Sequence, residues 1–108
     1  KVRATSGIVA QEFSTGLWAK DGRTFINIRE LRADASLVDV RLYEFDAAFN
    51  LKLMRRAETA QWQDGQWMLR QVTQTLIEES GTRTARQPDR PLVSAVTPDL
   101  LAVLMVET

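Results

Sequence analysis

Acid–base chemistry in this chain depends on carboxylates, lysines and one tyrosine, because its 108 residues include no histidine and no cysteine. These absences exclude Ser-His-Asp catalysis, cysteine nucleophiles, and thiolate or imidazole metal sites. Glu78 and Glu79 are adjacent, so on a strand their side chains point to opposite faces and cannot work as a pair. Asp21 and Asp64 each precede a glycine and are explained by turns. We therefore predict no catalytic residue, no metal and no cofactor, and a protein that is not an enzyme.

Charge and size indicate a single ordinary domain. Fourteen Lys and Arg residues balance fourteen Asp and Glu residues, and this zero net charge argues against a nucleic-acid binder. Eleven of the basic residues are Arg, and nearby acids favour a solvated face over a phosphate site for pairs such as Arg55-Arg56. With 44% hydrophobic residues the chain can bury one core, so we predict one domain, residues 1–108. Because it begins at Lys1, we expect a piece of a larger protein.

Two Asp-Gly dipeptides predict two hairpins. Asp21-Gly22 and Asp64-Gly65 each separate apolar segments rich in aromatic or β-branched residues. Both residue types tolerate the positive φ that a two-residue type I′ turn requires. The predicted cross-strand pairs are Trp18 with Phe25 in the first hairpin, and Trp62 with Trp67 and Ala60 with Leu69 in the second. Each hairpin would then carry an aromatic pair on one face.

The spacing of the other apolar segments favours an all-β fold. Val38, Val40 and Leu42 alternate with charged residues, as in a half-buried strand. The alternation slips at Tyr43, which suggests a β-bulge or an edge. About eight strands at this spacing are typical of a sandwich, a jelly roll or a barrel.

The clearest helix signal lies near the end of the chain. Thr97, Pro98 and Asp99 suit an N-cap and a first helical turn. We predict at most one short helix, near residues 98–103, with a last strand as the alternative. The apolar run Leu100–Val106 is far shorter than the roughly 18 residues of a membrane span, so no span is expected in this chain.

Six short blocks, in a fixed order, resemble one known protein family. They cover most of the chain and are Gly16–Gly22, Phe25–Ile28, Leu42–Phe45, Ala57–Trp62, Trp67–Val72 and Thr97–Leu101. No block is a chemical signature by itself, so the likeness rests on the series. In this series the chain resembles the YjgP/YjgQ family, the permease subunits of the lipopolysaccharide exporter.

The resemblance implies a β-jelly-roll of two splayed antiparallel sheets at the periplasmic face of the bacterial inner membrane. Such a domain is inserted between the membrane-spanning halves of the permease. The family also implies lipopolysaccharide as the ligand, and LptF, LptC and the ATPase LptB as partners, with ATP hydrolysed outside this chain. The chain departs from the family in having no membrane spans, so it cannot transport anything alone.

A jelly roll whose sheets splay along one side can cover acyl chains with its apolar inner faces, at about 0.8 kcal/mol per buried CH₂. We expect the groove between the sheets to be lined by Trp18, Phe25, Ile28, Leu42, Phe45, Trp62, Trp67 and Leu69. The same residues could equally form an ordinary core, and the sequence does not separate the two roles.

Two other functions stay open. A protein-docking or gating module would bind a partner jelly roll by edge-strand addition without holding lipid. A carbohydrate-binding module would use exposed Trp side chains as a flat platform. An inter-sheet groove would favour lipid, a closed core with a free edge would favour docking, and a flat Trp strip would favour carbohydrate.

Overall fold

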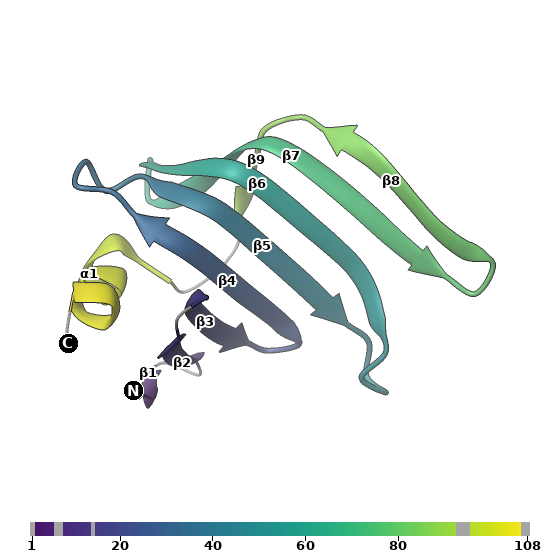
Figure 1. Cartoon of the computed structure of the whole chain (residues 1–108), viewed down its shortest axis with the longest axis horizontal. Coiled ribbons are helices and arrows are strands. Elements are labelled where there is room, and N and C mark those ends of the chain that lie inside the picture. Colours follow the sequence, from purple (N-terminus) through teal and green to yellow (C-terminus); the bar gives the residue numbers. More distant parts are fainter. Residues whose placement is uncertain (1, 6–7, 14, 93–95, 107–108) are drawn as a thin grey trace.

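The computed structural model describes residues 2–5, 8–13, 15–92 and 96–106, which form nine strands and one helix (Figure 1). The strands are β1 (Val2–Thr5), β2 (Ile8–Phe13), β3 (Gly16–Asp21), β4 (Thr24–Leu31), β5 (Leu37–Phe45), β6 (Leu51–Gln63), β7 (Gln66–Glu78), β8 (Gly81–Gln87) and β9 (Arg90–Leu92). The helix is α1 (Pro98–Val106). The predicted β fold with one short helix is confirmed, and α1 continues past residue 103.

The strands belong to one antiparallel sheet, in which sequence neighbours are also spatial neighbours from β1 to β8. β8 pairs with Val72–Glu78 of β7, and β9 pairs with Trp67–Leu69 of the same strand. β8 and β9 therefore follow one another along one edge of β7, with Pro88 between them, where a proline interrupts the ladder. We expected two splayed sheets, but the described residues form one continuous sheet whose long strands bend along their length (Figure 1).

The hairpin between β6 and β7 has the predicted register. Gln63 pairs with Gln66, Trp62 with Trp67, and Ala60 with Leu69. Asp64 and Gly65 have φ values of 51° and 79°, so both central residues take the positive φ of a type I′ turn.

The hairpin between β3 and β4 differs from the prediction by one residue. Asp21 pairs with Thr24, so the loop is Gly22-Arg23 and not Asp21-Gly22. Gly22 has a φ of 65° and Arg23 has no positive φ, the pattern of a type II′ turn with glycine at its first central position. The dipeptide suits either turn, so the turn residues alone could not fix the register.

The alternation of inward-facing and outward-facing side chains is shifted by one residue at a single row of positions that crosses four strands. On either side of this row, apolar residues of the core recur three positions apart: Ile28 and Leu31, Leu37 and Val40, Ala57 and Ala60, and Leu69 and Val72. The row itself, called here the inversion row, consists of Arg29, Asp39, Glu58 and Gln71, where cross-strand pairing is interrupted while the register on both sides is kept. Asp39 and Gln71 have positive φ values of 56° and 54°. The inversion turns apolar residues on both sides of the row toward the same core.

In β5 the predicted face of Val38 is wrong, and the predicted bulge is confirmed. Val38 was expected on the same face as Val40 and Leu42, but it lies beyond the row and points the other way. The expected bulge is present, with the register shift between Glu44 and Phe45.

The core and α1 lie on one side of the sheet. Thr97 caps α1 as predicted, because its hydroxyl oxygen accepts a hydrogen bond from the Leu100 amide at 3.2 Å. Leu101 of α1 is fully buried in the core. The indole nitrogen of Trp67 donates a hydrogen bond to the Val96 carbonyl at 3.1 Å, so the segment that leads into α1 is bound to the sheet.

Candidate functional site

The cross-strand register assigns side chains to the two faces of the sheet. We call the face that carries the core the inner face, and the opposite one the outer face. One row of the inner face contains Ala19, Ile26, Leu42, Arg55 and Gln74. The neighbouring row of the outer face contains Lys20, Phe25, Tyr43, Met54 and Thr75.

Five of the predicted groove residues lie on the inner face. Ile28, Trp67 and Leu69 are each 1% exposed, and Leu42 is 3% exposed. Trp62 is 36% exposed and meets Trp67 edge to face, with ring centroids 5.1 Å apart. The predicted contact between the two tryptophans is present, and the other members of this group are packed into the core.

Trp18, Phe25 and Phe45 lie on the outer face, so the structure does not bring all the predicted residues together. Trp18 stacks on Tyr43 with ring centroids 5.8 Å apart, and Phe25 meets Phe45 edge to face at 5.5 Å. The core instead takes the smaller aliphatic side chains that alternate with these aromatics, such as Ala19. Our prediction was wrong here because we took the aromatic residues as the inward-facing ones.

The tryptophans do not form the flat platform that carbohydrate binding requires. Trp18 is half-buried against Tyr43, and Trp67 is buried while Trp62, which it meets edge to face, is exposed. The rings therefore lie on different faces and at different depths, which argues against the carbohydrate-binding alternative.

A hollow of about 250 Å³ opens on the inner face beside the core. Its lining residues are Thr24, Leu42, Glu44, Arg55, Leu69, Arg90, Pro91 and Leu92. We call it the core-side hollow. Three leucines give it an apolar wall, while Glu44, Arg55 and Arg90 place three charged groups around that wall.

Arg55 is the best-anchored charge of the core-side hollow. Its side chain is 17% exposed, and it donates hydrogen bonds to Glu44 at 2.6 Å and to Gln74 at 2.8 Å. Burial lowers the pKa of the Arg55 guanidinium, Glu44 partly offsets this, and the nearby charge of Arg90 lowers the pKa further. Arg55 stays protonated at any physiological pH, so the site holds two cations and one carboxylate.

A second hollow of about 470 Å³, which we call the edge hollow, is formed by side chains of the paired strands β7 and β8. Its lining residues are Gln74, Leu76, Arg83, Thr84, Ala85 and Gln87. Leu76 pairs with Leu53 of β6, and both are half-buried inner-face leucines outside the closed core. Since Gln74 lines the edge hollow and binds Arg55, the two hollows adjoin along the inner face.

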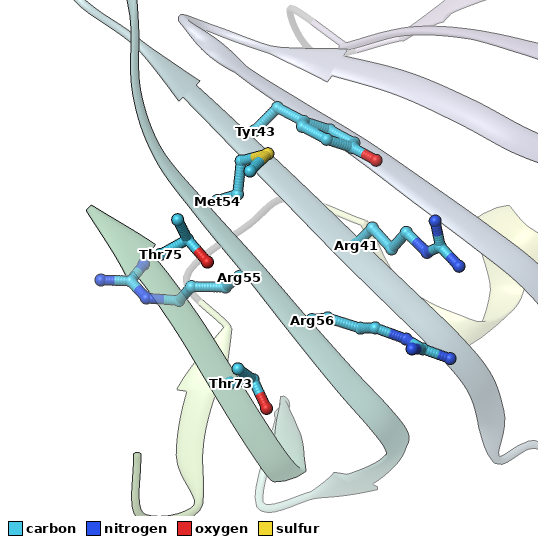
Figure 2. A pocket seen from close by; sticks show the side chains of 7 residues that line it. All are labelled: Arg41, Tyr43, Met54, Arg55, Arg56, Thr73 and Thr75. Carbon is cyan, nitrogen blue, oxygen red and sulfur yellow. The ribbon is translucent and has the colours of Figure 1, made fainter. Parts of the chain in front are cut away.

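The outer face has a hollow of about 320 Å³, shown in Figure 2. Asp39 accepts hydrogen bonds from Arg41 at 3.1 Å and from Arg56 at 3.0 Å beside this hollow. The Arg41 bond is the main cause that lowers the pKa of Asp39 below its usual value, and the Arg56 bond adds to it. In Figure 2 Arg55 points away from Arg41 and Arg56, as expected for adjacent residues of one strand.

The sequence does not predict that Glu44, Arg55 and Arg90 form a group. It favours a solvated face for Arg55-Arg56, but only Arg56 is exposed. Strand alternation was the available signal, because two adjacent arginines on a strand must place one on each face. Arg90 could not have been placed this way, since its position depends on β9 pairing with β7.

No cluster of three or more His, Cys, Asp or Glu side chains suited to a metal ion occurs in the described residues. Within the same residues, no helix is long and apolar enough to cross a membrane.

Residues 1–106 match the family model described as lipopolysaccharide export system permease LptF/LptG, and the chain belongs to this family. It is a family of transport subunits and not of enzymes, in agreement with the expectation from the sequence. The chain is 30% identical over 106 residues to the lipopolysaccharide export system permease protein LptG of Haemophilus influenzae. That alignment covers 96% of this chain and 30% of the relative.

LptG of Escherichia coli strain K12 is a second relative, 33% identical over 101 residues. This alignment covers 82% of the chain and 28% of the relative, and LptG of Escherichia coli O6:H1 gives the same values. The chain thus spans about 30% of the length of the relatives it matches. The family resemblance read from the six sequence blocks is confirmed.

Proposed function

We propose that this chain is the periplasmic domain of a lipopolysaccharide-export permease, and that acyl chains of lipopolysaccharide pass along its inner face. The observation that carries this proposal is the pair of adjoining hollows on that face. Leu42, Leu69 and Leu92 form the apolar wall of the core-side hollow, and Leu76 belongs to the edge hollow. Leu42, Leu69 and Leu92 are buried, so an acyl chain would gain roughly 0.8 kcal/mol for each CH₂ that it buries against the half-buried leucines beside them, such as Leu76.

In this proposal the inner face of the curved sheet has the role that was expected for the groove between two sheets of a jelly roll. Its deepest residues, such as Leu69 and Ile28, hold the fold together, while the half-buried Leu53 and Leu76 are accessible to a ligand. Partial exposure suits a transport surface. An acyl chain that buries only the exposed part of each leucine gains little free energy and can therefore dissociate again.

The family also supports a placement and a set of partners. We propose that the domain lies at the periplasmic face of the inner membrane, inserted between membrane-spanning halves that are not part of residues 1–108. LptF, LptC and the ATPase LptB would be its partners in the full complex, with lipopolysaccharide as the cargo. The relatives that share this domain are about three times its length, which agrees with a domain inside a larger permease.

Photo-crosslinking in the full complex tests the proposal with matched neighbours. Leu76 and Ile77 are adjacent, both half-buried, and lie on opposite faces of β7. Leu53 and Met54 form the same kind of pair on β6. A photoreactive residue at Leu76 or Leu53 should label lipopolysaccharide when ATP is hydrolysed, and one at Ile77 or Met54 should not. Equal labelling at both members of each pair would contradict an inner-face path.

A docking function is favoured by one separate observation, the exposed edge of β8. Six of its seven residues are exposed, and in the described residues β8 pairs only with β7. An edge of this kind can accept a strand from a partner jelly roll by β-augmentation. Disulfide crosslinking from a cysteine at Thr84 to LptF or LptC, with no lipid labelling at Leu76, would favour docking over lipid handling.

A further inference from the structure

Arg55 and Arg90 point to the same region of the inner face from different strands. Arg55 pairs with Leu42 across β5 and β6, and Arg90 pairs with Leu69 across β7 and β9. Both arginines and both leucines line the core-side hollow. The proximity of the two guanidinium groups is also felt electrostatically, since Arg90 lowers the pKa of Arg55.

The carboxylates near this hollow balance only one of the two arginines. Glu44 binds Arg55 at 2.6 Å. Asp89, the acid next to Arg90 in sequence, is held elsewhere by Arg70 at 2.9 Å and by the Gln71 amide at 3.4 Å. Among the residues that the structure describes, the Arg90 side chain makes no hydrogen bond or ion pair. Counting the described side chains alone, the hollow therefore carries one more positive than negative charge.

Arg90 lies where an unpaired charge is unfavourable without a ligand. It is half-buried, and its neighbours in the hollow include the buried residues Leu69 and Leu92. A partly desolvated cation gains more from an anion than a fully hydrated one does, because the local dielectric is lower. The exposed Arg86 of β8 lies on the outer face, away from these leucines.

We propose that Arg55 and Arg90 form a binding site for a phosphate monoester carried by an amphiphile whose acyl chain lies along the half-buried Leu53 and Leu76 of the same face. This inference rests on the proposed function, because it names the headgroup chemistry of the lipid in that hollow. A phosphate monoester carries a charge of about −1.5 to −2 at neutral pH and three strong acceptor oxygens. Guanidinium groups bind such oxygens bidentately, and two guanidiniums can share one phosphate.

The site fits a phosphate better than an uncharged lipid. One phosphate can neutralise Arg90 and still accept from Arg55 while Glu44 stays in place. An uncharged lipid would leave Arg90 unpaired next to apolar atoms, which opposes binding. The polar and apolar walls of the hollow thus select an anionic headgroup with a chain attached to it.

The test uses the full-length permease in its membrane complex, with a photoreactive residue at Thr24, which is half-buried and lines the hollow. The probes are lipid A with its phosphates and the same lipid after the phosphates are removed. Arg90→Gln should lower labelling by phosphorylated lipid A by about tenfold and leave labelling by the dephosphorylated lipid within about twofold. Arg90→Lys, which keeps the charge but not the fork, should have an intermediate effect.

Arg86→Gln is the matched control, since Arg86 is an exposed arginine of the adjacent edge strand and lies on the outer face. It should change neither signal. If both lipids were labelled equally well in the wild type and in Arg90→Gln, the phosphate site would be wrong and the acyl path would remain. If neither lipid were labelled, the proposed function itself would be contradicted.

Inorganic phosphate in the same assay separates the two sources of the anion. If millimolar phosphate displaces phosphorylated lipid A only while Arg90 is present, the site accepts phosphate from solution as well as from a lipid. If it does not compete, the site depends on the attached acyl chain. Both results support an anion site, while competition that is unchanged by Arg90→Gln would contradict it.

Discussion

Gly16 has a φ of 104°, and a Cβ placed on it would collide with the backbone carbonyl of Ile28 and come within 2.9 Å of Arg29 Cα. Gly16 is the first residue of β3, and the absence of a side chain there lets the backbone of β3 lie close to that of β4. We expect Gly16→Ala to lower the free energy of unfolding by about 2 kcal/mol or more, because backbone has to move. Equilibrium urea unfolding measures this change.

Gly22→Ala is the matched control for Gly16, because Gly22 also has positive φ, 65°, but no atom within 4 Å of the added Cβ. It should cost only the conformational strain, about 1 kcal/mol. Equal losses in the two variants would mean that the contact with β4 has no energetic role.

Asp39 makes the stability of the chain sensitive to acid. Its pKa is lowered from the usual 3.8, chiefly by the hydrogen bond from Arg41 and then by the one from Arg56. Because the folded pKa is lowered, the carboxylate stabilises the fold fully above pH 3.8, and this contribution is lost as the pH falls through the folded pKa. Asp39→Asn keeps a residue that tolerates the φ of 56° but removes the charge.

Unfolding measured over a pH series should therefore separate Asp39→Asn from the wild type above pH 3.8 and bring the two together in acid. Asp34 and Asp46 also have lowered pKa values, so both proteins keep some acid sensitivity. Only the difference between the two curves reports on Asp39. Parallel curves would show that its ion pairs contribute nothing.

At the scale of strands, the inversion row decides which side chains face the core. Gln71 has a φ of 54° on this row, a conformation that β-branched residues avoid. Gln71→Val should lower the free energy of unfolding by about 1 to 2 kcal/mol, although valine favours strands elsewhere.

Gln66→Val gives the comparison for Gln71, since Gln66 is an exposed glutamine of the same strand without positive φ. It should be neutral or slightly stabilising. Urea denaturation of both variants would disprove the strained geometry if Gln71→Val were as well tolerated as Gln66→Val.

The two hairpins show what local sequence can predict about strands. At Asp64-Gly65 both residues take positive φ, and the register followed directly from the turn. At Asp21-Gly22 the same dipeptide forms a different turn, and the register there places the buried Ala19 opposite the buried Ile26. The inversion row left a signal in the three-residue spacing of apolar residues, but it becomes visible only when four strands are aligned.

At the scale of the whole molecule, the family could be recognised from the order of six sequence blocks, while the candidate site could not be assembled from them. Leu42, Trp62, Trp67 and Leu69 were placed together correctly on the inner face. The charged part of the site depends on β9, a three-residue strand that returns to β7 after Pro88. Such a contact depends on the path of the entire chain and has no local sequence pattern.

The two faces should also differ in transport. Leu76→Asn puts a short polar side chain into the edge hollow, where it cannot extend to water as a lysine could. Sliding acyl chains would have to desolvate the amide, so ATP-driven release of lipopolysaccharide from vesicles containing the full complex should fall by about three- to tenfold. Ile77→Asn replaces an aliphatic side chain of the same size, with a larger loss of strand propensity, at the neighbouring half-buried position on the outer face, and release should stay within about twofold of wild type. Comparable complex yield and thermal unfolding of the two variants would exclude misfolding as the cause. If Ile77→Asn slowed release as much as Leu76→Asn, the inner face would not be the path of the lipid, and docking through the β8 edge would become the better account of this domain.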